Sequence, residues 1–241
     1  MRPQWLDCSG NQSVLKQCEA LLDGDRANYG AQGRLIFVMG APRAGASAIA
    51  KALYAVAVRR GVRSLGLGEA PWGTNVNLRN HFLRSLEVPL LPDDFWSNEL
   101  SSRPYEAVVA LRAYQAVLID DGHDYFRCNK SVVRRNFDRI LQLTEVRAKL
   151  QVFIFGLHDI LEPVAIKAAN AGIEVIRLSL SAMPYDEQYH KFVNGLMSRY
   201  PFSSEMDRPF VDIGSVHRFS KGRVGLTADV VRDICSGLVL I

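Results

Sequence analysis

Short apolar runs alternate with longer segments of helical periodicity through most of the chain. The apolar runs predict strands at residues 34–39, 62–67, 116–119, 152–155 and 173–178. Apolar residues at helical spacing predict helices between them, at residues 47–60, 78–86, 105–114, 132–150 and 161–171. Strands that alternate with helices are typical of an α/β protein with a doubly wound parallel sheet.

The two ends of the chain carry only helical patterns. Apolar residues between 14 and 22 predict one leading helix that ends near Gly24. Beyond Ser181 we expect helices alone, at residues 185–200, 211–219 and 227–236. The chain is therefore predicted to have an N-terminal helical extension (1–32), an α/β core (33–180) and a small helical lid subdomain (181–241).

Composition adds few constraints to this picture. Hydrophobic residues make up 48% of the 241 residues and charged residues 22%, as in an ordinary globular protein. A formal net charge of +4 permits a nucleic-acid partner without requiring one. The four cysteines form no Cys-x-x-Cys pair, which argues against a structural zinc site. No apolar run approaches the ~18–20 residues that span a bilayer, so we expect a cytoplasmic protein without a membrane partner.

The first predicted strand leads into a glycine-rich loop, Gly-Ala-Pro-Arg-Ala-Gly-Ala-Ser, at residues 40–47. It matches the phosphate-loop pattern Gly-x₄-Gly-Lys-Ser/Thr at Gly40, Gly45 and Ser47, and departs from it at Ala46. The lysine of that pattern bridges the β- and γ-phosphates, which a methyl group cannot do, although Arg43 could supply a charge from another position. A tight strand–helix turn would also explain the two glycines, but the buried strand before them and the helix after them favour a phosphate loop.

The strand at 116–119 ends in two carboxylates, Asp120 and Asp121. In P-loop NTPases the first acid at such a place holds Mg²⁺ and the second polarises the attacking water. Asp120 fits the metal role together with Ser47. Asp121 is a degenerate catalytic acid, because it is one methylene shorter than the usual glutamate. The alternative is that both acids cap the loop that follows.

On these motifs the chain resembles the TniB/TnsC family of AAA+ transposition helper proteins. Further matching segments are His123 after the acidic strand, residues 78–91, residues 152–156 and a Ser-x-Gly-x-x-Gly pattern at 220–225. The resemblance implies a P-loop NTPase fold of the AAA+ kind, ATP and Mg²⁺ as cofactors, and assembly on double-stranded DNA. It also implies contacts with a DDE-type transposase and with a target-selection protein.

Four departures from the family pattern fall on positions that serve hydrolysis. They are Ala46, Asp121, the pair Leu157 and His158 after the sensor strand, and Gly172-Ile173 in place of an Arg-Phe pair. We therefore expect an accessory or regulatory protein of DNA transposition that does not hydrolyse ATP. The alternatives are a working ATPase with a rearranged phosphate grip and a decoy that co-assembles with an intact paralogue. A homo-oligomer is compatible with each of these.

Basic residues on the helix after the acidic strand are candidates for contacts with the DNA backbone. They are Lys130, Arg134, Arg135 and Arg139. Arg135 and Arg139 share a helix face, and such contacts rely on arginine and lysine. A solvated helix face explains the same pattern. His123 and His158 are expected near the strand ends as polar residues of the former nucleotide pocket.

Overall fold

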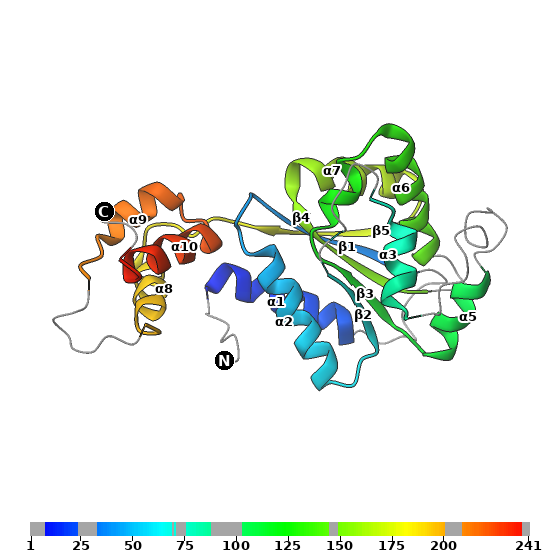
Figure 1. The fold of residues 1–241 in the computed structure, drawn as a ribbon, viewed down its shortest axis with the longest axis horizontal. Coiled ribbons are helices and arrows are strands. Elements are labelled where there is room, and N and C mark those ends of the chain that lie inside the picture. Colours follow the sequence, from blue (N-terminus) through cyan, green and yellow to red (C-terminus); the bar gives the residue numbers. More distant parts are fainter. Residues whose placement is uncertain are drawn as a thin grey trace.

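One five-stranded parallel sheet forms the centre of the molecule, in the order β2-β3-β4-β1-β5 (Figure 1). The computed structural model describes residues 8–23, 33–68, 70, 76–87, 103–144, 149–200 and 209–237. The strands are β1 (Arg34–Gly40), β2 (Ser64–Leu67), β3 (Ala116–Ile119), β4 (Gln151–Leu157) and β5 (Glu174–Leu180). The predicted doubly wound parallel sheet is confirmed.

Strand β1 occupies an inner position, where it pairs with β4 on one side and β5 on the other. Its residues Leu35 to Met39 are almost completely buried. Successive side chains point to opposite faces of a sheet, so Leu35, Phe37 and Met39 enter one apolar cluster and Ile36 and Val38 the other. This is why the run reads as continuously apolar in the sequence.

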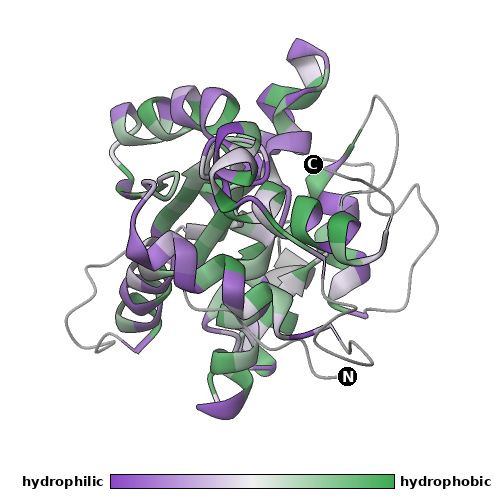
Figure 2. Ribbon diagram, turned by 90° about the vertical axis from the view of Figure 1, so that its left-hand side faces the viewer, coloured by the Kyte–Doolittle hydropathy of each residue, from purple (hydrophilic) through white to green (hydrophobic). Residues whose placement is uncertain are grey.

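Helices cover both faces of the sheet (Figures 1 and 2). One face packs against α1 (Ser9–Asp23) and α2 (Ala46–Arg59). The other carries helices that supply residues of the second cluster: α3 (Leu78–Ser85), α5 (Arg103–Leu111), α6 (Lys130–Thr144) and α7 (His158–Asn170). Figure 2 shows green along the strands and purple mainly on the surrounding helices.

The N-terminal helix α1 belongs to this core. Cys18 is fully buried, and Leu15 and Leu22 pack with it in the cluster beneath α2. Arg60, just after α2, forms ion pairs with Glu19 and Asp23 on α1. The helix predicted in the N-terminal extension ends at Asp23, as expected, and is packed into the α/β layer.

Several element boundaries differ by two or more residues from the sequence-based expectation, among them the end of α6 and the start of α7. The helix predicted to run to Leu150 ends at Thr144, and residues 145–148 lie outside the described residues. Leu150 is fully buried, and its N–H donates to the carbonyl of Leu143. Its apolar side chain extends the helical periodicity of α6, but it belongs to the entry into β4. Helix α7 begins at His158, three residues earlier than predicted.

The C-terminal helices are α8 (Glu187–Met197), α9 (Ile213–Ser220) and α10 (Val224–Cys235). They pack around an apolar cluster of their own, beside the end of β5 (Figure 1). The buried Tyr189 hydroxyl lies 3.1 Å from Ser220 Oγ and 3.0 Å from Thr227 Oγ1, which joins all three helices. Within the described parts of the chain, no helix is both long and apolar enough to cross a membrane.

Candidate functional site

The glycine-rich loop lies between β1 and α2, at the carboxyl edge of the sheet. Gly45 is the N-cap of α2 with φ 104°, a left-handed conformation that favours glycine, and no side chain caps the helix there. The first N–H groups of a helix have no partner within the helix. This start of α2 is therefore a backbone cradle that can accept an anion.

Ala46, in the position of the usual lysine, is the first residue of α2. Its methyl group is partly buried against the apolar cluster beneath that helix. Ser47, the residue predicted as a Mg²⁺ ligand, follows in the same turn. The loop thus keeps the backbone and the hydroxyl of a phosphate loop and lacks its charge.

Arg43, the candidate replacement for that charge, contacts the C-terminal helices. Its Nη1 lies 3.2 Å from Oδ2 of Asp229 on α10, and its side chain is 66% exposed. Its carbonyl accepts a hydrogen bond of 2.8 Å from the N–H of Gly225. Asp229 pairs in addition with Arg232, at 3.0 Å. Arg43 therefore fastens the loop to α10.

The Ser-x-Gly-x-x-Gly pattern at 220–225 forms this contact. Gly222 has φ +68°, and a Cβ atom there would lie 2.0 Å from the carbonyl oxygen of Met183. A Cβ atom on Gly225 would lie 2.8 Å from the carbonyl oxygen of Arg43. Both glycines allow a close backbone approach, the first within the C-terminal part and the second to the phosphate loop.

Asn11 on α1 holds the loop from the other side. Its Nδ2 donates a 3.0 Å hydrogen bond to the carbonyl of Ala44, and the residue is only 2% exposed. A Cβ atom on Gly45 would lie 2.5 Å from this Nδ2. Sequence reasoning missed Asn11 and Asp229, because each is a single polar residue on a helix with no motif around it.

Asp120 and Asp121 follow β3 at the same edge of the sheet. Asp120 Oδ1 accepts a hydrogen bond from the Asp121 N–H at 3.0 Å, so the first acid does contact the loop backbone. Asp121 has φ 48° and ψ 35°, a left-handed conformation that is uncommon for residues other than glycine.

His123 lies beside these acids in the short helix η2 (Gly122–Phe126) and is 8% exposed. A Cβ atom on Gly156 would lie 2.8 Å from its Nδ1, so the ring packs against the end of β4. Burial lowers the pKa of His123, while Asp124, 3.6 Å from its Nε2, acts in the opposite direction. We infer a neutral imidazole at neutral pH, which suits a packed polar residue.

His158 directly follows the carboxyl end of β4, as the first residue of α7. Its side chain is half exposed, with Nδ1 3.7 Å from Asp159 on the same helix. Among the described residues, no group of three histidine, cysteine, aspartate or glutamate side chains could hold a metal ion.

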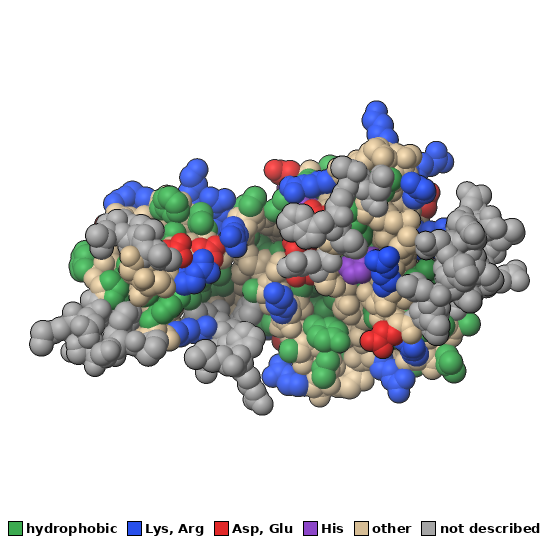
Figure 3. Space-filling model, in the orientation of Figure 1, with side chains coloured by type: hydrophobic (Ala, Val, Ile, Leu, Met, Phe, Trp, Pro, Cys, Tyr) green, Lys and Arg blue, Asp and Glu red, His purple; other side chains and the backbone are tan. Residues whose placement is uncertain are grey.

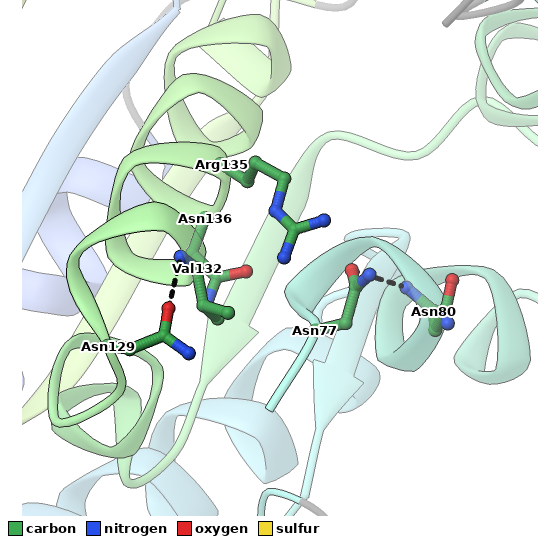
Figure 4. A pocket seen from close by; sticks show the side chains of 6 residues that line it. All are labelled: Asn77, Asn80, Asn129, Val132, Arg135 and Asn136. Atoms are coloured by element: carbon green, nitrogen blue, oxygen red, sulfur yellow. Dashed lines mark hydrogen bonds between the residues drawn. The ribbon is translucent and has the colours of Figure 1, made fainter. Parts of the chain in front are cut away.

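The four basic residues predicted for DNA lie on or at the start of α6, in different surroundings. Lys130, Arg134 and Arg135 are exposed, whereas Arg139 is half-buried and donates to Gln142. Arg135 lines a pocket of about 450 Å³ with Asn77, Asn80, Asn129, Val132 and Asn136 (Figure 4). Figure 3 shows Lys and Arg side chains spread over this face of the molecule.

The strand order, the loop between β1 and α2 and the acids after β3 define the fold of a P-loop NTPase of the AAA+ kind. Solved structures agree. Cdc6p from Pyrobaculum aerophilum superposes with a TM-score of 0.59 at 15% identity, over 98% of this chain and 64% of that one. AMPPCP-bound DnaA from Aquifex aeolicus gives 0.55 at 11% identity, over 97% and 64%.

A Walker-type ATPase of Pyrococcus abyssi gives a TM-score of 0.53 at 13% identity, over 98% of this chain and 69% of that one. The chain thus spans about two-thirds of the length of these structures. No family model matches the chain. No curated protein matches it either.

Proposed function

We propose that this protein is an AAA+-like accessory protein of DNA transposition that does not hydrolyse ATP and acts through partners and DNA. The observation that carries the first part is a phosphate loop that lacks the lysine of the pattern. Ala46 packs into an apolar cluster, and Arg43 faces Asp229. Charge stabilisation in the transition state is the main catalytic contribution to phosphoryl transfer, so its loss removes turnover first.

Nucleotide binding without turnover is compatible with the groups that remain. The uncapped start of α2 can accept a phosphate through backbone N–H groups, and Ser47 and Asp120 would hold Mg²⁺. DnaA, one of the similar structures, is AMPPCP-bound. ATP with Mg²⁺ would then act here as a structural ligand, with Asp121 no longer a working catalytic acid.

The role in transposition rests on the motifs shared with the TniB/TnsC family. It assigns a DDE-type transposase and a target-selection protein as partners, with double-stranded DNA as the surface of assembly. In this proposal residues 1–32 form the N-terminal helical extension, residues 33–180 the core and residues 181–241 the lid. Self-assembly and co-assembly with an intact paralogue both fit it.

A working ATPase with a rearranged grip is the second candidate function. The pair between Arg43 and Asp229 favours it, because the arginine side chain is 66% exposed. An exposed ion pair contributes about 0–1 kcal/mol, so a bound nucleotide could displace the carboxylate. Arg43 would then face the phosphates.

The test is phosphate release from ATP by the full chain, compared with the Asp120→Ala variant. We expect release at the background rate in both proteins. Turnover that disappears in Asp120→Ala would overturn the proposal. Thermal stability with ATP and Mg²⁺ measures binding separately, since a ligand at 100 times its Kd adds about 2.7 kcal/mol. Nucleotide stabilisation that is lost in both Arg43→Ala and Ser47→Ala would support the rearranged grip.

A further inference from the structure

A polar pocket of about 450 Å³ lies between the first turns of α3 and α6, apart from the phosphate loop (Figure 4). Its size falls within the range of about 300–1,000 Å³ of small-molecule sites. Asn77, Asn80, Asn129 and Arg135 line it together with Val132 and Asn136. No acidic residue is among these lining residues.

Asn136 fixes the two walls of the pocket relative to each other. It is 1% exposed, and its Oδ1 accepts a hydrogen bond from the Leu78 N–H at 3.0 Å. Its Nδ2 donates to the carbonyls of Val76, at 2.8 Å, and Tyr125, at 2.9 Å. One buried side chain on α6 therefore holds the start of α3 in place, and the pocket is preformed.

The side-chain oxygens of Asn77 and Asn129 are engaged in capping the two helices. Asn77 is the N-cap of α3, and its Oδ1 accepts from the N–H groups of Arg79 and Asn80. Asn129 Oδ1 accepts from Ser131 Oγ and from the N–H of Val132, at the start of α6. With Oδ1 engaged in capping, the amide group of Asn77 has donor hydrogens left for a ligand.

Arg135 adds the charge. Its guanidinium extends from α6 into the space toward α3 (Figure 4). Within the described residues no hydrogen bond or ion pair engages it, and the neighbouring carboxylate of Asp138 on α6 forms none with it. The positive ends of two helix dipoles lie at the same place. The pocket presents donors and positive potential.

We propose that this pocket binds a phosphate group, with the Arg135 guanidinium and the amides of Asn77 and Asn80 as its ligands. Where the phosphate is part of a DNA backbone, the proposal rests on the DNA contact in the proposed function. A free phosphate compound offers the same chemistry. Arginine is suited to either, because its planar fork donates two parallel hydrogen bonds to phosphate oxygens.

The test measures binding of a fluorescein-labelled 30-base-pair duplex by anisotropy over a series of salt concentrations. Arg135→Ala should weaken binding about tenfold and make the plot of log K against log[salt] shallower by about 1. Asn77→Asp should weaken binding at least as much, because it replaces a donor by a negative charge. It keeps an oxygen to cap α3, so thermal stability should not fall. The matched control is Arg84→Ala, which removes an exposed charge from α3, outside the residues that line the pocket, and should change affinity less than about threefold.

The possible outcomes distinguish a failure of the phosphate pocket from a failure of the proposed DNA binding. Equal losses in Arg84→Ala and Arg135→Ala, with Asn77→Asp unchanged, would overturn the pocket and leave a general basic face as the DNA contact. If wild type does not bind the duplex, but millimolar inorganic phosphate raises its melting temperature and not that of Asn77→Asp, the pocket stands and its ligand is a free phosphate. Absence of both effects would overturn the proposal.

Discussion

Three side chains around the phosphate loop decide what this site can do. Ala46 contributes only a methyl group, Arg43 faces Asp229, and Asn11 holds the carbonyl of Ala44. Each stabilises the loop by contacts within the chain. A loop that is held in this way retains its shape without a nucleotide, which is what a binding module with no need for turnover requires.

Ala46→Lys is expected to raise the affinity for an ATP analogue by at least about tenfold, because the new ammonium lies at the start of α2 beside the phosphate cradle. The apolar stem of a lysine can cover the cluster that Ala46 contacts while its charge reaches solvent. Turnover should still be absent, since Asp121 is unchanged. A fluorescent ATP analogue measures the affinity.

Ala48→Lys is the matched control, because Ala48 is exposed on the first turn of the same helix. It adds an equal charge in a different direction and should change the affinity less than about threefold. An equal gain in both variants would mean that net charge, and not the position of Ala46, limits nucleotide binding.

At the scale of elements, the C-terminal part meets the core through backbone as much as through side chains. The Gly225 N–H donates to the Arg43 carbonyl of the core at 2.8 Å, and within the C-terminal part the Gly222 carbonyl accepts the N–H of Met183 at 2.8 Å. These contacts place the start of α10 beside the phosphate loop. The turn before α10 and the first residues of that helix therefore form a joint whose geometry depends on two glycines.

Gly222→Ala should lower the free energy of unfolding by about 2–4 kcal/mol. The left-handed conformation costs about 1–2 kcal/mol for a residue with a Cβ atom, and the collision with Met183 adds to it. Denaturant unfolding measures the loss. Gly61→Ala is the control, because Gly61 has the same φ of +68° and open space around it. Equal losses of unfolding free energy in the two variants would show that the contact between the new Cβ atom and the Met183 carbonyl costs nothing.

Much of the fold was predictable because strands and helices leave local patterns. Successive side chains of the run at 34–39 enter two different apolar clusters. A strand that is covered on both faces needs such a continuously apolar run. The phosphate loop was recognisable by its glycines, whereas the contacts of Asn11 and Asp229 that hold it were not. Asn11 lies 33 residues before Ala44, and such a contact depends on tertiary packing that no local pattern records. The pocket beside Arg135 was missed for the same reason, since Asn136 joins two helices distant in the sequence.

At the scale of the whole molecule, the connection between the α/β core and the C-terminal helices depends little on charge. The pair between Arg43 and Asp229 is partly exposed, and such pairs typically contribute about 0.2–1 kcal/mol. The close approach of Gly225 to the loop leaves no room for a side chain. The position of α10 against the phosphate loop should therefore depend on the backbone contact of Gly225 more than on the ion pair.

A double-mutant cycle of Arg43→Ala and Asp229→Ala should give a coupling energy below about 1 kcal/mol, measured by denaturant unfolding. Hydrogen exchange of the amide at position 225 should stay slow in both variants. Gly225→Ala should accelerate this exchange at least about tenfold, because its Cβ atom displaces the loop carbonyl. Slow exchange in Gly225→Ala would contradict this account of the joint.

The inner position of β1 also has a consequence for synthesis on the ribosome. Arg34 is in register with Gln151 of β4 and Glu174 of β5, so neither neighbour exists until roughly 120 more residues have been translated. At about 5–20 residues per second, the apolar segment from Leu35 to Met39 waits roughly 6–24 s without a strand partner. During this interval the nascent chain exposes this apolar segment, and helices α1 and α2 are the first elements available to shield it. A chaperone that binds the emerging segment would act in this window.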